Sequence, residues 1–237
     1  MKKLLVTCLL SLLFVGAYAG ISTKEKQALL DLYASTHGEN WIHSWDTNEP
    51  VNNWYGVTIE NDKVVGLSLL FNNIKGSLPA SIGDLENLRI LELSFNSISG
   101  TLPDTLGNLI NLEVLAFNGN NISGAIPSSL ENLTSLRQLH LSSNHLNGMI
   151  PESIGNLTQL EVFNVFDNNL IGTLPTGLAN NLNLRELMVA ENNLEDTSNV
   201  SAILLSNSGS KLNLNESNSI TPAATNIIAI ESSDDEN

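Results

Sequence analysis

Few residues of this 237-residue chain could carry out chemistry. Catalysis needs a nucleophile with its base, a pair of carboxylates in a cleft, or a cluster of metal ligands. The histidines form one pair near residue 40 and another near residue 140, and their spacing does not predict that any two converge: His37, His43, His140 and His145. We therefore predict no enzyme, no catalytic residues and no cofactor.

A group of acids between residues 167 and 196 offers the carboxylate oxygens that calcium prefers. It comprises Asp167, Glu191, Glu195 and Asp196. The group lacks the regular ligand spacing of a calcium-binding loop, which favours solvated acidic side chains over a cation site. The sequence thus predicts no metal site.

The charge balance limits the partners of the chain. Asp and Glu number 25 against 10 Lys and Arg, which gives a net charge of −15. We expect no nucleic-acid partner, because there is no excess of basic side chains to replace the counterions of phosphates. Residues 231–237, ESSDDEN, are interpreted as a solvated acidic tail.

Residues 1–19 have the pattern of a secretory signal peptide. Two lysines precede an apolar run from Leu4 to Val15, and Ala17 and Ala19 frame a cleavage site. The alternative is a membrane anchor, but the run is shorter than the ~20 residues that a spanning helix needs. Cys8, the only cysteine, lies in this segment. We expect a protein that is secreted, extracellular or at the cell surface, without disulfides and without membrane insertion after cleavage.

The elements that position the remaining side chains follow a repeat of 24 residues. Five full units and a truncated sixth share the pattern LxxLxLxxNxLxGxLPxxLGNLxx, and they begin at Val64, Leu88, Leu112, Leu136, Leu160 and Leu184. Within a unit the apolar positions four and six alternate with polar ones, as Leu91 and Leu93 do, which predicts a short strand with one buried face. One unit alone would leave its apolar residues in water, so the units must stack.

One asparagine recurs at position nine of every unit, directly after the strand. The chain must turn inward there, and an amide can satisfy backbone N–H and C=O groups that lose their ladder partners. We interpret the asparagines as structural rather than as a binding row: Asn72, Asn96, Asn120, Asn144, Asn168 and Asn192. The glycines that follow at position 13 suit a turn of unusual dihedrals, and the prolines at position 16 interrupt pairing on the outer side.

The combination of Leu, Asn, Gly and Pro at these offsets resembles the plant-type leucine-rich repeat of receptor-kinase ectodomains, polygalacturonase inhibitors and related secreted proteins. The resemblance implies an α/β repeat solenoid, a right-handed superhelix with a parallel concave sheet. Repeats would occupy residues 64–196 and an N-terminal cap residues 20–63. In the cap, Ser22 and Glu25 form a capping-box pattern that predicts a helix ending near Gly38, and the tryptophans would act as apolar lids. Residues 197–230 are expected to form a degenerate C-terminal cap.

The side chains of the strands that do not point inward face the concave side. At position two the charges alternate from Arg89 to Arg185, which predicts a lateral ion-pair ladder. We favour mutual neutralisation on an exposed face over a charged docking stripe. Other concave positions vary between units and combine exposed apolar side chains with polar ones, a composition that suits an interaction surface. The predicted partner-binding residues are Phe71, Ile90, Phe95, Val114, Asn118, His140, Ser142, Asn164, Phe166 and Met188, with Val162 beside them.

These features predict a recognition module that binds a protein or a surface glycan through its concave face. Six strands at ~4.8 Å and five residues at ~3.3 Å give a concave patch of roughly 470 Å². A standard interface uses about 800 Å² per partner, so strong binding needs the flanks or caps as well. The alternatives are a structural or adhesive protein of the cell envelope and, by family resemblance alone, an inhibitor of a wall-degrading glycosidase.

Overall fold

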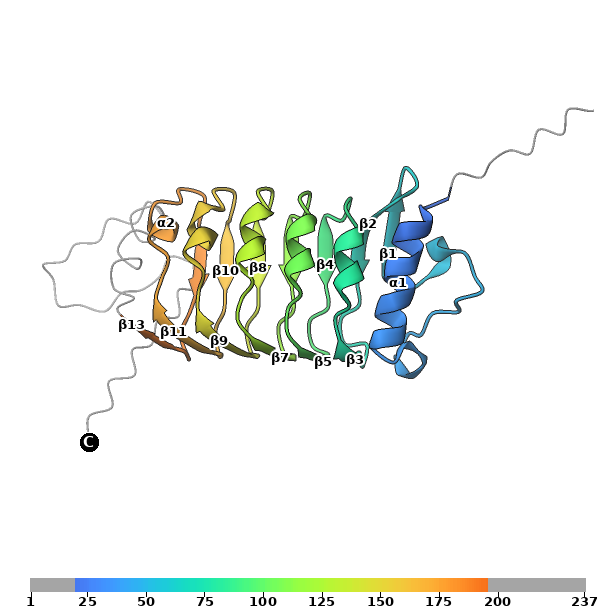
Figure 1. The fold of residues 1–237 in the computed structure, drawn as a ribbon, viewed down its shortest axis with the longest axis horizontal. Helices are drawn as coiled ribbons and strands as arrows, with labels where there is room; N and C mark the ends of the chain where they lie inside the picture. Colours follow the sequence, from blue (N-terminus) through green and yellow to red (C-terminus); the bar gives the residue numbers. More distant parts are fainter. Residues whose placement is uncertain (1–19, 196–237) are drawn as a thin grey trace, which may run out of the picture.

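The computed structural model describes residues 20–195 as one elongated solenoid (Figure 1). The predicted signal peptide, the degenerate C-terminal cap and the acidic tail lie outside the described residues. Within the described range each 24-residue unit forms one coil, and successive coils lie side by side from α1 to β13.

The first strand of each unit joins a seven-stranded sheet along one side of the solenoid. Its order is β1-β2-β4-β6-β8-β10-β12, and all neighbours are parallel except the β1–β2 hairpin. Leu91 pairs with Leu115, at an offset of one repeat, because the coils have equal length. The strands are β1 (Val57–Glu60), β2 (Lys63–Ser68), β4 (Ile90–Glu92), β6 (Val114–Ala116), β8 (Gln138–His140), β10 (Val162–Asn164) and β12 (Glu186–Met188).

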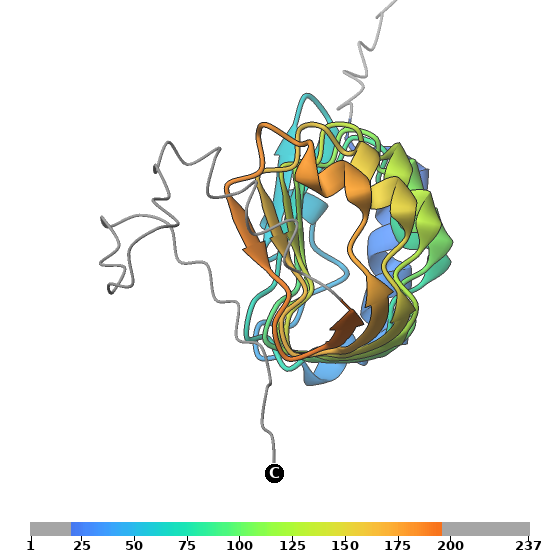
Figure 2. The ribbon, with the colours of Figure 1, turned by 90° about the vertical axis from the view of Figure 1, so that its left-hand side faces the viewer.

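A second sheet, which the sequence did not lead us to expect, follows the inward turn. Its order is β13-β11-β9-β7-β5-β3, again parallel. Viewed from the end, it forms the lower wall of the coil, and short helices cover the wall opposite the first sheet (Figure 2). The strands are β3 (Lys75–Ser77), β5 (Ser97–Gly100), β7 (Asn121–Gly124), β9 (His145–Met149), β11 (Asn169–Thr173) and β13 (Asn193–Glu195).

The short helices begin directly after the repeated proline, which has extended backbone and no N–H to lose. They pack tightly through glycine: a Cβ atom added at Gly107 would lie 2.4 Å from the carbonyl oxygen of Ser129 in the next coil. The elements are η3 (Ala80–Asp84), η4 (Asp104–Asn108), η5 (Ser128–Asn132), η6 (Glu152–Asn156) and α2 (Thr176–Ala179).

The core runs without interruption through the centre of the coils. The predicted inward positions are fully buried, including Leu91, Leu93, Leu115 and Phe117, each with 0% exposure. Leucines from the short helices, such as Leu106, meet them from the other wall. Each coil therefore covers the apolar edge of its neighbours, as stacking requires.

The repeated asparagines turn their amides into the coil. Asn168 is typical: its Nδ2 donates to the carbonyl oxygens of Leu141, Val165 and Phe166 at 3.0 to 3.3 Å, and its Oδ1 accepts the N–H of Leu146 at 3.0 Å. Each amide thus joins two coils and satisfies backbone groups at the turn.

The asparagine column continues into the N-terminal cap. Asn72 accepts the N–H of His43 at 2.7 Å, so the cap replaces a preceding coil. The Nδ2 of Asn72 is buried and has no partner among the described residues.

The cap helix is α1 (Thr23–Ser35), and its capping box is present as predicted. Ser22 Oγ accepts the N–H of Glu25 at 3.1 Å, and the Glu25 carboxylate accepts the N–H of Ser22. Glu25 does more than its sequence position indicated: it is 3% exposed and also accepts the N–H of Val64 at 3.1 Å. This carboxylate therefore ties the cap to the first repeat.

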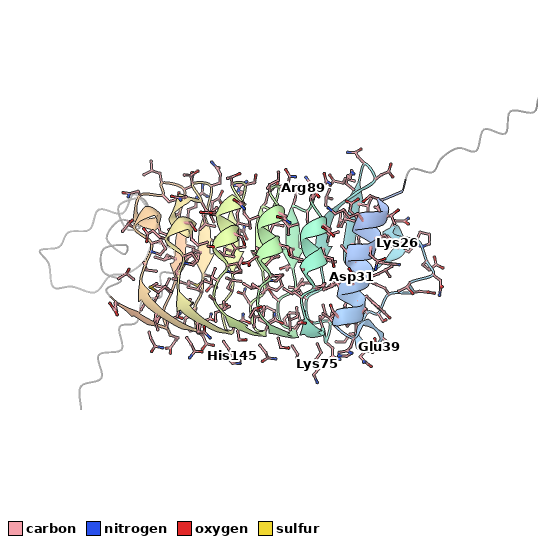
Figure 3. All side chains as sticks on the ribbon, in the orientation of Figure 1. Lys26, Asp31, Glu39, Lys75, Arg89 and His145 are labelled. Carbon is pink, nitrogen blue, oxygen red and sulfur yellow. The ribbon has the colours of Figure 1, made fainter. Side chains whose placement is uncertain are left out.

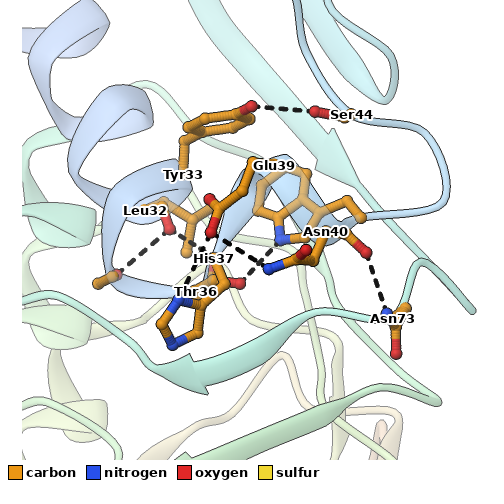
Figure 4. Close-up of polar contacts among 10 residues, drawn as sticks. Leu32, Tyr33, Thr36, His37, Glu39, Asn40, Ser44 and Asn73 are labelled. Carbon is orange, nitrogen blue, oxygen red and sulfur yellow. Dashed lines mark hydrogen bonds and ion pairs between the residues drawn. The ribbon is translucent and has the colours of Figure 1, made fainter.

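Beyond α1, two short 3-10 turns, η1 (Gly38–Asn40) and η2 (Val51–Asn53), complete the cap. Trp41, Trp45 and Trp54 are at most 4% exposed, as predicted for lids, and Trp45 stacks on Trp54 with ring centroids 4.7 Å apart. Figure 4 shows the end of α1, where Asn73 Nδ2 donates to the carbonyl of Asn40 at 3.0 Å. Aromatic packing and these bonds hold the cap without a disulfide.

Candidate interaction surface

The predicted concave residues differ in how much of each side chain is exposed to solvent. Phe71, Ile90 and Phe95 are 63%, 43% and 48% exposed. Val114, Asn118, His140, Ser142, Val162, Phe166 and Met188 are half-buried, and Asn164 is buried. The available apolar surface is therefore concentrated in the first two units.

Phe71 and Phe95 stack on each other just beyond the ends of β2 and β4. Their ring centroids are 4.5 Å apart and their planes differ by 5°. Both residues have left-handed backbone, with φ of 51° and 58°. Bulky residues rarely adopt this conformation, which costs roughly 1–2 kcal/mol for a side chain with a Cβ. The structure thus keeps two exposed aromatic rings at positions where a small residue would be less strained.

Position eight is left-handed in all six units, with φ between 51° and 63°. We call these residues the left-handed ridge; they lie between the concave sheet and the asparagine turn. Its chemistry changes along the solenoid from aromatic through small to acidic: Phe71, Phe95, Gly119, Ser143, Asp167 and Glu191. A Cβ atom at Gly119 would lie 2.9 Å from the Phe95 ring, so the glycine leaves room for that ring.

The apolar surface extends from the ridge into the cap, which the sequence analysis missed. Ile42 is 65% exposed and donates its N–H to the carbonyl of Asn72. The His43 ring lies 4.2 Å from that of Tyr55, which is 49% exposed. Ile42 directly follows Trp41 and Tyr55 directly follows Trp54. An apolar residue beside each buried tryptophan was therefore the available sequence signal for this surface.

Several predicted polar binding groups are already engaged within the protein. Asn118 Oδ1 accepts both the N–H and the hydroxyl of Ser142, each at 2.9 Å. Asn164 Oδ1 accepts the N–H of Phe166 at 3.1 Å. These amides stabilise the strand ends, and their role in partner binding stays a prediction.

His140 lies on β8 at the centre of the concave sheet, and its Nε2 is 3.2 Å from Gln138 Oε1. Burial lowers the pKa of His140 below its usual value, against the opposing effect of Glu186 and Glu92. The imidazole is therefore held neutral near pH 7.

Of the ion pairs expected between neighbouring charges at position two, one is present within residues 20–195. Arg137 pairs with Glu161, with Nε 2.8 Å from Oε1. Arg89 instead pairs with Glu60 of β1, the strand that the sequence analysis did not anticipate. Figure 3 places Arg89 at the edge opposite His145 and Lys75, which lie along the second sheet.

His140 and His145 lie on different sheets, and the described residues hold no group of three or more His, Cys, Asp or Glu that could bind a metal ion. A shallow depression of ≈ 640 Å³ lies on the flank beside Glu86, Ile110 and Glu131. No helix within residues 20–195 has the length and hydropathy to cross a bilayer.

Several solved structures similar to this chain are ectodomains of plant receptors. The ectodomain of the receptor kinase SOBIR1 from Arabidopsis thaliana is 28% identical, with a TM-score of 0.64 and coverage of 74% of this chain and 97% of that one. A chain of the BIR3–SERK2 complex from the same plant is 26% identical, with a TM-score of 0.61 and coverage of 72% and 95%.

The ectodomain of GASSHO1/SCHENGEN3 from Arabidopsis thaliana, solved in complex with CASPARIAN STRIP INTEGRITY FACTOR 2, is 30% identical with a TM-score of 0.68. The match covers 71% of this chain but only 21% of that larger ectodomain. The family model of the leucine-rich repeat region matches residues 65–222, more than half of the sequence. The chain therefore belongs to the leucine-rich repeat family and carries repeats of the plant type.

Proposed function

We propose that this protein is a secreted recognition module that binds a protein partner through its concave face and left-handed ridge. The similar ectodomain of GASSHO1/SCHENGEN3 was solved in complex with CASPARIAN STRIP INTEGRITY FACTOR 2, and another similar chain was solved in the BIR3–SERK2 complex, which supports a protein partner. Secretion would follow cleavage after Ala19, and protein sequencing of the mature N-terminus tests it.

The observation that carries the proposal is the exposed Phe71–Phe95 stack. An unstrained sequence would place Gly, Asn or Asp at a left-handed position, and Gly119 and Asp167 do so in later units. Backbone strain kept at exposed positions supports a functional role for the two rings. Aromatic rings are also enriched at the energetic centres of interfaces.

The area of the surface is consistent with such a role when the cap contributes. The concave face alone offers roughly 470 Å², below the about 800 Å² per partner of a standard interface. Ile42 and Tyr55 extend the apolar surface beyond the first repeat. We therefore expect the partner to contact the first two repeats together with the cap.

The test uses the mature chain and a displayed library of protein fragments, followed by affinity measurement of the selected binders. The double variant Phe71→Asn and Phe95→Asn should lose at least about tenfold in affinity, since centrally placed aromatic residues typically contribute 2 kcal/mol or more. Ile110→Asn is the matched control, because Ile110 is 56% exposed on the opposite flank.

Retained affinity in the phenylalanine variant would refute the proposal. Binding to a glycan array that is unaffected by that variant would favour a glycan partner. Adhesion that depends on the second sheet, and not on Phe71 or Phe95, would favour the structural alternative. Inhibition of a wall-degrading glycosidase rests on family resemblance alone.

A further inference from the structure

The left-handed ridge has two ends of different chemistry, and this difference defines the kind of partner that fits. At the N-terminal end the ridge presents the exposed rings of Phe71 and Phe95. Two charged groups of the same units have partners within residues 20–195: Glu92 on β4 accepts the hydroxyl of Ser68 at 2.9 Å, and Arg89, just before β4, pairs with Glu60.

At the C-terminal end the ridge is acidic and its carboxylates are free. Asp167 and Glu191 are exposed and have no ion pair or side-chain hydrogen bond within residues 20–195. Four carboxylates and one guanidinium lie at concave and ridge positions of the last two units: Glu161, Asp167, Arg185, Glu186 and Glu191. Among the residues that the structure describes, Glu161 is the one of these acids that has an ion pair. A basic group would be attracted here, and the net charge of −15 would steer it.

We propose that the partner presents an extended segment with an apolar side chain at one end and basic side chains at the other. The apolar side chain packs on the Phe71–Phe95 stack, and lysine or arginine contacts Asp167 and Glu191. This inference rests on the proposed function and specifies the chemistry of the partner.

The repeat sets the spacing between the two contacts. Asp167 is three strands from Phe95 and Glu191 is four, or about 14 Å and about 19 Å at ~4.8 Å per strand. An extended segment advances ~3.3 Å per residue, so the apolar and basic side chains lie about four to six residues apart. Gly119 and Ser143, between the two ends of the ridge, are small and uncharged.

The test selects random peptides on the immobilised mature chain and measures their affinities by fluorescence anisotropy. Selected peptides should combine an apolar and a basic side chain at this spacing. The double variant Asp167→Lys and Glu191→Lys should bind them about tenfold more weakly, because two attractive contacts become repulsive. Peptides in which the basic residues are replaced by glutamate should recover affinity for this variant alone.

A matched control separates local contacts from overall charge. Asp104→Lys with Glu131→Lys makes the same charge change at exposed helix positions on the far wall and should leave the affinity nearly unchanged. Thermal melting of both variants checks that they fold.

Two results would overturn the inference: selected peptides without basic residues, or equal weakening by the ridge and control variants. If Phe71→Asn with Phe95→Asn abolishes binding while the lysine variant retains it, the proposed function stands and the inference fails. If neither variant affects binding, both fail.

Discussion

Replacing Asn168 with leucine tests the asparagine column, on which the alignment of the ridge depends. The side chain is 7% exposed, makes three donated bonds and accepts one N–H. Leucine has the same number and branching of side-chain heavy atoms and suits an apolar interior, so hydrophobicity alone predicts little loss. The hydrogen bonds of Asn168 instead predict a clear loss of stability.

The magnitude follows from which backbone groups lose their only partner. The carbonyl of Leu141 keeps the amide of Asn144, and that of Val165 keeps the amide of Asn192. The N–H of Leu146, in contrast, donates to Asn168 Oδ1 at 3.0 Å, and leucine at position 168 offers no acceptor for it. One orphaned buried N–H costs about 1–3 kcal/mol, which is the expected loss in free energy of unfolding.

Denaturant unfolding followed by circular dichroism measures this loss, with Asn169→Leu as the control. Asn169 is the next residue and is exposed on the second sheet, so its replacement should change stability by less than about 0.5 kcal/mol. Asn96→Leu should cost about twice as much as Asn168→Leu, because Asn96 Oδ1 accepts the N–H groups of both Asn72 and Ile74. Equal midpoints for the Asn168 and Asn169 variants would refute this reasoning.

Three further outcomes are expected. Phe95→Asn should change the free energy of unfolding by no more than about 1 kcal/mol, as relief of left-handed strain offsets lost ring stacking; a larger loss in denaturant unfolding would assign Phe95 to stability instead of binding. Gly107→Ala should lower stability by about 1–3 kcal/mol because its methyl group would meet the Ser129 carbonyl, and an unchanged melting temperature would contradict this packing. Burial lowers the pKa of His140, so its contribution to stability is present above about pH 6.5 and is lost as pH falls through the folded-state pKa. The His140→Gln variant should therefore show a smaller drop in unfolding free energy than the unchanged protein between about pH 7.5 and about pH 5.5. An equal drop in both proteins would argue against this role of His140.

The sequence was sufficient to predict those features that depend on a short local pattern of residues. Alternating apolar residues such as Leu91 and Leu93 locate the first sheet, and the capping box of Ser22 and Glu25 locates α1. Asparagine at a fixed offset predicts an internal hydrogen-bonding role because stacking repeats the same turn in every coil. These inferences needed only local pattern and the rule that apolar faces must be covered.

The second sheet could not be inferred in the same way. Its strands are short and have at most one buried residue each, as Ile98 is in β5, which is too little for an alternation signal. They pair only because equal coil lengths bring them into register. The β1–β2 hairpin did have a sequence signal, because Asn61 and Asp62 follow the run from Val57 and both residue types tolerate the positive φ of a tight turn. Both residues have positive φ in the structure.

The partner-binding set was predictable only in part. The exposure of Phe71, Ile90 and Phe95 follows from their positions in the strand, whereas the engagement of Asn118 with Ser142 depends on side-chain geometry between coils. The left-handed backbone of position eight was indicated by Gly119 and Asp167, since both residue types favour that conformation. The strain at Phe71 and Phe95 became visible only in the structure.

Photo-cross-linking tests most directly whether the left-handed ridge binds the partner. A benzophenone amino acid would replace Phe95 in one protein and Ile110, on the opposite flank, in another, each incubated with the same selected binder. Our account predicts a covalent adduct from position 95 and none from position 110. Adducts from position 110 alone, or from both positions equally, would contradict it.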